Sequence, residues 1–278
     1  MVPARKRSRM KPKVSPSGGG GRFTRGEHVR VVPLYQPKPK VPIEGAREIR
    51  EVEETRLASL TYRGGPLLTR VEVYTIFWGV TWKEPAGQEL MKRINDFYHA
   101  ILPSPLLTQM EEYNVAGQQI GHGVWVGSKA ISTGAPKVSV TDTTVRTWLK
   151  KWTNAGTVRR WTKNALYFIY LDPGIVSVMG GARSCQSFCG YHNNAGKLYY
   201  AVMPYPSCTG CLGGMDPFDA LTGTSSHELC EAITDPVPGT GWYDDNFGEI
   251  GDICAWRFKQ VVGYTVQLEW SNKHQGCI

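Results

Sequence analysis

From about residue 60 onward, apolar strand-like segments alternate with amphipathic helix-like segments, and this alternation constrains the fold more than any other feature. Four segments are rich in apolar, β-branched and aromatic residues and are expected to form strands: 71–79, 117–131, 165–171 and 198–203. Two helices are expected between them: residues 87–102, with apolar side chains at helical spacing, and a segment capped by Thr141-Asp142. This order is typical of βαβ crossovers. We therefore predict an α/β (α+β) fold with a mixed sheet flanked by helices.

The first part of the chain differs in composition from the rest. Residues 1–40 contain 11 Lys or Arg and one acid, together with six of the 18 prolines, whereas residues 41–278 contain 21 basic and 23 acidic residues. A polar segment rich in Pro and Gly buries too little apolar surface to fold alone. We therefore predict a disordered basic tail over residues 1–58 and a single folded domain over residues 59–278.

The distribution of charge restricts the partners that we expect. Residues 41–278 have a net charge of −2, so the body lacks the basic surface that nucleic-acid-binding domains use. The tail can serve as a loading or export leader, as a basic address or as a tether to an acidic partner, or it can have no specific partner. No uncharged apolar run is long enough to predict a membrane span, and no recognisable signal peptide begins the chain.

Seven cysteines are concentrated in the last third of the chain: Cys185, Cys189, Cys208, Cys211, Cys230, Cys254 and Cys277. The first four form an x3 pair and an x2 pair, and the x3 pair is longer than the usual zinc knuckle, so disulfides are favoured over a zinc site or free thiols. A bond between Cys254 and Cys277 would tie the terminal strand to the body, and Cys230 is the expected odd thiol. Disulfides indicate an oxidising place, so we expect an exported or extracellular protein despite the missing signal peptide.

A helix is expected near residues 217–235, and it carries a His-Glu-x-x-Glu motif. One of the two serines before the motif can cap this helix, and Pro236 ends it. His227 and Glu231 are four residues apart, so they share a face and can reach one ion. Glu228 follows His227 directly, in the position of the general base of His-Glu-x-x-His zinc peptidases. The alternative is a helix with exposed acids whose histidine only caps or packs.

Three acids are candidates to complete a metal site. Glu249 follows Glu231 by 18 residues, a spacing like that of peptidases whose third zinc ligand is a downstream glutamate, and we rank it first. Asp235 is also near, but the chain meets Pro236 one helical turn past Glu231, so Asp235 ranks below Glu249. Asp252 is expected to accept the imidazole N–H of His227 and to fix its tautomer, with direct ligation as an alternative.

The expected ligand set affects the choice of metal. One His with two carboxylates leaves a zinc site formally neutral, which makes Zn²⁺ a weaker Lewis acid than in a site with two His. A set rich in carboxylates also accepts Mn²⁺ or Ca²⁺. Outside the helix, His192 and Tyr243 are candidates to stabilise an oxyanion in the same site.

The sequence resembles the phosphate-induced, Exordium-like family of plant and bacterial extracellular proteins over about residues 60–278. The similarity is carried by 62–68, 71–78, 97–113 and 187–192, and above all by 226–236 (SHELCEAITDP) and 248–254 (GEIGDIC). The resemblance implies a secreted, zincin-like domain whose motif residues are His227, Glu228, Glu231 and Glu249. Family members often have Asn in place of Asp235.

The function that we expect is a zinc-dependent hydrolase, most simply a metallopeptidase acting on a peptide or protein. In it, Glu228 serves as base and His227, Glu231 and Glu249 hold the metal. The alternative is a non-catalytic, extracellular, disulfide-braced binding or signalling protein with a structural metal site. A third hypothesis is nucleic-acid binding through the basic tail alone.

Overall fold

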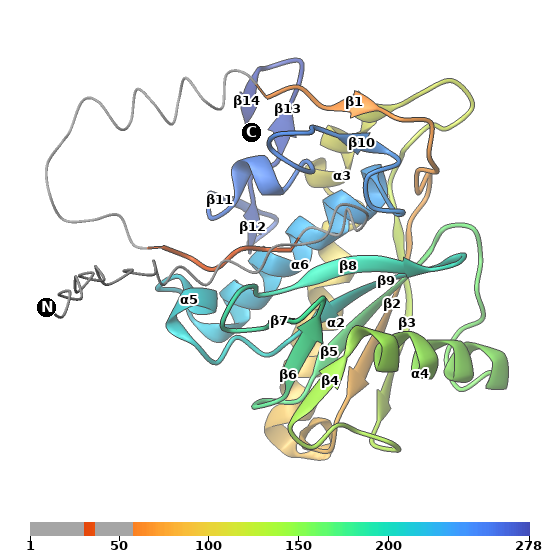
Figure 1. Ribbon diagram of the computed structural model, residues 1–278, viewed down its shortest axis with the longest axis vertical. Helices are drawn as coiled ribbons and strands as arrows, with labels where there is room; N and C mark the ends of the chain where they lie inside the picture. Colours follow the sequence, from red (N-terminus) through yellow and green to blue (C-terminus); the bar gives the residue numbers. More distant parts are fainter. Residues whose placement is uncertain (1–30, 37–57) are drawn as a thin grey trace, which may run out of the picture.

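A five-stranded sheet lies at the centre of the computed structural model, which describes residues 31–36 and 58–278 (Figure 1). The strands, in spatial order, are β3 (Val124–Ile131), β2 (Glu72–Trp78), β5 (Ala165–Leu171), β9 (Leu198–Met203) and β8 (Tyr191–Ala195). The first four are parallel, and β8 pairs antiparallel with β9 at one edge. The predicted α/β fold with a mixed sheet and flanking helices is confirmed.

Both faces of the sheet are buried at its centre, which explains why strands β2, β5 and β9 are almost continuously apolar. Side chains alternate along each strand, so Val73 and Phe77 of β2 enter one core whereas Ile76 and Trp78 enter the other. Strand β5 is buried at every position. The sheet therefore separates two hydrophobic cores.

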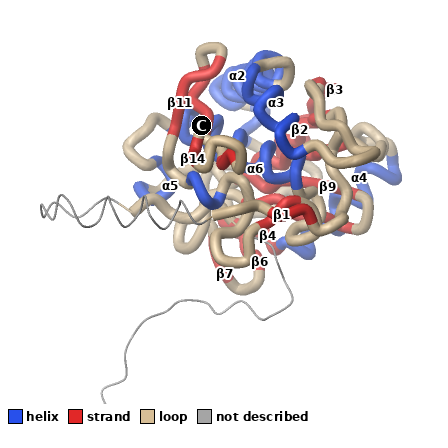
Figure 2. Tube along the Cα trace, turned by 90° about the horizontal axis from the view of Figure 1, so that it is seen from above, coloured by secondary structure: helices blue, strands red, loops and turns tan. Residues whose placement is uncertain are grey.

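Helices cover the two faces unequally. The first core is covered by α2 (Pro85–Ile101), α3 (Pro105–Met110) and α6 (Pro217–Thr234), and the second by α4 (Asp142–Ala155). Figure 2 shows α4 across the strands from α2. Thr141 caps α4 as predicted, because its hydroxyl accepts the backbone N–H of Thr144 at 3.2 Å. No helix among the described residues is long and apolar enough to cross a membrane.

Short elements complete the domain around this sheet. They are β1 (Thr61–Tyr62) paired with β10 (Trp242–Tyr243), the three-stranded β4 (Ser139–Thr141), β6 (Val176–Met179) and β7 (Ala182–Arg183), the hairpin β11 (Phe258–Val261) and β12 (Tyr264–Gln267), and the pair β13 (Trp270–Ser271) and β14 (Gly276–Cys277). One further short helix is α5 (Thr209–Leu212), and three 3₁₀ turns are η1 (Thr81–Lys83), η2 (Glu111–Tyr113) and η3 (Asp252–Cys254).

Three disulfides join the cysteines: Cys185–Cys208, Cys189–Cys211 and Cys254–Cys277. Cys230 is free and buried, as predicted. The first two bonds fasten the start of the β8–β9 hairpin to α5, and the third ties β14 to η3. Disulfides persist in oxidising compartments, so the structure supports the prediction of an oxidising environment.

Six residues of the predicted tail pack on the body. Val32 is 3% exposed and pairs with the chain just before β8, donating its N–H to the carbonyl of Gly190 at 3.0 Å and accepting from the N–H of Cys189 at 2.8 Å. The Trp256 indole donates to the carbonyl of Pro33 at 2.8 Å. This segment, red in Figure 1, lies beside α5. The other residues of the predicted tail up to 57 lie outside the described part of the chain.

Two boundaries differ from the predictions. Strand β3 begins at Val124, because a turn in which Val115 and Gln118 bond to each other occupies the start of the expected segment 117–131. Helix α6 begins at Pro217, where the carboxylate of Asp216 accepts two backbone N–H groups. The predicted cap at Ser225 or Ser226 is therefore wrong, since both serines lie inside the helix.

Candidate metal centre

Helix α6 carries the His-Glu-x-x-Glu motif through the interior of the protein. The helix is buried on all sides from Ala220 to Thr234, against β8, β9 and β12. Ser226 shows how these contacts are satisfied, since its hydroxyl accepts the backbone N–H of Gln267 on β12 at 2.9 Å. Polar side chains on this helix must therefore find their partners inside the protein, because water does not reach them.

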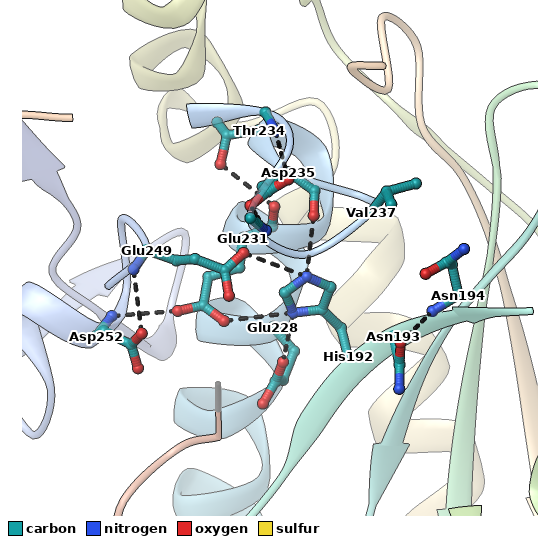
Figure 3. Close-up of polar contacts among 12 residues, drawn as sticks. His192, Asn193, Asn194, Glu228, Glu231, Thr234, Asp235, Val237, Glu249 and Asp252 are labelled. Atoms are coloured by element: carbon teal, nitrogen blue, oxygen red, sulfur yellow. Dashed lines mark hydrogen bonds and ion pairs between the residues drawn. The ribbon is translucent and has the colours of Figure 1, made fainter. Parts of the chain in front are cut away.

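Strand β8 brings His192 to this helix (Figure 3). Its Nδ1 lies 3.2 Å from Glu228 Oε2 and 3.4 Å from Glu231 Oε2. Its Nε2 lies 3.1 Å from the backbone carbonyl oxygen of Asp235 and 3.4 Å from Glu249 Oε1. The imidazole is thus enclosed by carboxylates, and its exposed fraction is 1%.

His227 is held from its far side by Gln267. Its Nε2 faces Glu231 Oε1 at 2.9 Å, and its Nδ1 lies 3.0 Å from Gln267 Oε1. Gln267 Nε2 donates to the carbonyl of Gly251 at 2.9 Å, which sets the orientation of the amide. The amide oxygen therefore accepts, and Nδ1 of His227 carries the proton. This leaves Nε2 as the nitrogen that can bind a metal.

Glu249 and Asp252 reach the motif from the segment before and within η3. Asp252 forms a potential ligand group with His227 and Glu231, in which one ligand atom from each lies within 4.8 Å of the others. Its backbone N–H donates to Glu231 Oε1 at 3.2 Å, and its carboxylate accepts the N–H of Glu249 at 3.1 Å. Glu249, ranked first as a third ligand, places its carboxylate against His192.

Asp235 uses its carboxylate to close a loop. The carboxylate accepts the backbone N–H groups of Gly239, Thr240 and Gly241 at 2.5, 3.0 and 2.6 Å. Its main-chain carbonyl, by contrast, contacts His192. The side chain of Asp235 thus stabilises the loop that follows α6, and its backbone orients the histidine.

Tyr243 lies on β10, where it is 3% exposed. It pairs with Thr61 of β1, and the guanidinium of Arg63 lies over its ring at 4.6 Å from the centroid. Its expected role at an oxyanion stays a prediction.

Several buried ligand atoms of this cluster have no hydrogen-bond partner among the described residues: His227 Nε2, Glu228 Oε1, Glu231 Oε2, Glu249 Oε1 and Glu249 Oε2. A buried polar atom left without a hydrogen bond costs about 1–3 kcal/mol. Two residue groups here could hold a metal ion: His192 with Glu228 and Glu231, and His227 with Glu231 and Asp252. The donor set therefore fits a divalent cation.

The pKa shifts of the histidines and of Glu231 also indicate that positive charge is stabilised in this cluster. Burial alone would lower the pKa of His192 and of His227, but the carboxylates around them, first Glu249 and Glu231 respectively, raise it well above the usual range. Burial would raise the pKa of Glu231, but the charge of His227 lowers it to about 2. Burial raises the pKa of Glu249 well above its usual value. The cluster thus favours ionised Glu231 beside a cation.

No protein-family model and no curated protein matches the chain. The resemblance to the Exordium-like family therefore stays a prediction from the motifs at 226–236 and 248–254.

Sequence reasoning missed Gln267 and the pairing of His192 with the motif. Gln267 lies 40 residues after His227, and a lone glutamine in a short strand carries no signal of its own. His192 was singled out only as a candidate for an oxyanion site. The contact of His192 with Glu228 depends on the β8–β9 hairpin. The polar sequence of β8 does not predict a strand there.

Proposed function

We propose that the protein is a zinc-dependent hydrolase, most simply a metallopeptidase. The observation that carries the proposal is the state of His227, whose Nδ1 donates to Gln267 while its Nε2 faces Glu231 Oε1 at 2.9 Å. An imidazole held in this way by an outer acceptor is typical of metal-ligating histidines.

The ligands that we propose for the zinc ion are His227, Glu231 and one further carboxylate. Asp252 is favoured by its place in the group around His227, and Glu249 stays the alternative from the sequence. Zinc, when bound, supplies Lewis acidity that polarises a carbonyl group and acidifies water. Because this set has two carboxylates, Mn²⁺ is the first alternative ion.

Glu228 is the residue that we propose to move the proton. It follows His227 on α6, is completely buried, and its Oε1 has no hydrogen-bond partner among the described residues. Burial raises its pKa, while His192 at 3.2 Å lowers it. A base with a raised pKa accepts a proton more readily near neutral pH.

The test separates metal binding from turnover. We expect Glu228→Gln to retain the ion proposed at His227 and to lose at least about 100-fold in peptide hydrolysis, since general-base catalysis contributes about 10²–10⁴-fold. His227→Ala is expected to lose the ion proposed at His227 as well as turnover. The matched control is Glu111→Gln, on an exposed 3₁₀ turn. Full activity of Glu228→Gln on a peptide library would overturn the assignment of the base.

A non-catalytic binding protein with a structural ion is the second candidate. It is favoured by the complete burial of His227, Glu228 and Glu231, each 0% exposed, because catalytic metals keep an open position. The discriminating measurement is the melting temperature of His227→Ala. A structural ion predicts a large fall, whereas a catalytic ion predicts loss of activity with a smaller fall.

The surroundings that we propose follow from the disulfides. An extracellular or otherwise exported protein would meet peptide or protein substrates, and its basic N-terminal part can bind an acidic partner or a loading or export machine. Nucleic-acid binding by that part is a lesser alternative, which loss of binding on deleting residues 1–40 would support.

A further inference from the structure

We propose that the site holds two divalent cations bridged by Glu231, with a second ion bound by His192, Glu228 and Glu231. The second ion is a Zn²⁺ or Mn²⁺ ion at Nδ1 of His192, beside the ion that the proposed function assigns to His227. The inference rests on the proposed function for the first ion only.

The contacts of His192 leave Nδ1 as the nitrogen that can bind a proton or a metal ion. A backbone carbonyl can only accept, so the contact of Nε2 with the carbonyl of Asp235 at 3.1 Å places the proton on Nε2. Nδ1 of the neutral ring then directs a lone pair at Glu228 Oε2 and Glu231 Oε2. Three acceptor atoms that face one another repel unless a proton or a metal ion lies between them.

The spacing of these atoms is wide enough for a metal ion between them. Bonds of about 2.1 Å to Zn²⁺ in tetrahedral geometry place neighbouring ligand atoms about 3.4 Å apart. Nδ1 of His192 lies 3.2 Å from Glu228 Oε2 and 3.4 Å from Glu231 Oε2.

Glu231 presents one oxygen to each histidine. Its Oε1 faces His227 Nε2 at 2.9 Å, and its Oε2 faces His192 Nδ1 at 3.4 Å (Figure 3 shows the His192 contact). Each ring has its other nitrogen occupied, by Gln267 for His227 and by Asp235 for His192. With one oxygen directed at each histidine, the Glu231 carboxylate can bridge one ion at His227 and a second ion at His192.

The carboxylates of the cluster have no strong cation beside them. Among the described residues, the ion-pair partners of Glu228, Glu231 and Glu249 are His192 and His227, with no Lys or Arg. Carboxylates buried without a compensating cation are costly. A second divalent ion between Glu228 and Glu231 would lower this cost.

The test counts ions in the full-length protein, stripped with a chelator and reloaded with Zn²⁺. Plasma mass spectrometry is expected to find two ions per chain in the wild type. His192→Ala is expected to keep one, and Glu231→Ala at most one. The matched control, His122→Ala, removes a histidine that contacts Thr108 and is expected to keep two.

A second measurement needs no variant and guards against misfolding of His192→Ala. The wild-type protein loaded with Mn²⁺ is expected to give the electron paramagnetic resonance spectrum of an exchange-coupled pair. The spectrum of isolated Mn²⁺ only, or one Zn²⁺ per chain that His192→Ala does not change, would overturn the two-ion proposal and leave the proposed function standing. No bound ion would overturn both. Two ions without hydrolysis would overturn only the proposed function.

Discussion

Gln267 accepts the Nδ1 proton of His227 at 3.0 Å and so determines which nitrogen of that ring faces Glu231. The interaction joins β12 to α6 in the interior of the protein. Its consequence is that the nitrogen of His227 that could bind a metal ion is selected by a residue outside the candidate ligand groups.

Replacing Gln267 should weaken metal binding without removing a ligand. We expect Gln267→Leu to lose about 10–100-fold in Zn²⁺ affinity, because the ring is no longer held in one tautomer. Gln267→Glu keeps an acceptor and should retain more affinity. Competition with a chromophoric chelator measures both. Gln260→Leu, on the neighbouring strand β11, is the control, and equal affinities for all three variants would contradict the role of Gln267.

Gly251 is a position where no side chain fits. A Cβ atom there would lie 2.8 Å from His227 Nδ1 and 3.0 Å from Glu231 Oε1. We expect Gly251→Ala to lower stability by about 1–3 kcal/mol, as overpacking does, and to reduce the metal content. Gly121→Ala, where the nearest atom is 4.0 Å away, should change neither. Calorimetry with metal analysis checks this, and a Gly251→Ala protein with full metal content would refute it.

The C-terminal disulfide should contribute strongly to stability. Removing both partners, Cys254→Ala with Cys277→Ala, is expected to cost about 3 kcal/mol, given a loop of 23 residues. Urea unfolding of the oxidised proteins measures the difference. Cys230→Ala leaves all three bonds in place, so it should stay as sensitive to reductant as the wild type. A double variant with the same urea midpoint of unfolding as the wild type would contradict this prediction.

Glu269 should make stability fall as pH rises. It is 0% exposed, and burial raises its pKa well above the usual value. The folded state therefore binds its proton more tightly than the unfolded state, so its contribution is full below about pH 4 and is lost as pH rises toward the folded pKa. Glu269→Gln removes this dependence. Between about pH 4 and pH 8, we expect the free energy of unfolding of the variant to rise by about 1–3 kcal/mol relative to that of the wild type. Melting temperatures measured across this range test the sign. A variant whose stability falls relative to the wild type as pH rises would contradict the prediction.

The parts of the fold that sequence could predict are those with strong periodicity. Residues 165–171 and 198–203 form β5 and β9 with the expected bounds, because short continuous apolar runs of this length are typical of buried strands. The spacing of His227 and Glu231 predicted their shared face, which is a property of the helix alone.

The parts that escaped prediction depend on tertiary contacts. Strand β8 (Tyr191–Ala195) contains His and two Asn, so neither period nor composition marks it as a strand; pairing with β9 makes it one. The same pairing brings His192 to Glu228, which lies 36 residues later. Likewise, the basic, Pro-rich composition of residues 1–40 does not predict that Val32 is buried.

The anchoring of residues 31–36 has a consequence for whatever is attached before them. Val32 is bonded on both sides to the chain that leads directly into β8, within two residues of His192 at Gly190. The point at which residue 31 joins the body is therefore fixed beside the strand that carries His192, one of the candidate metal ligands.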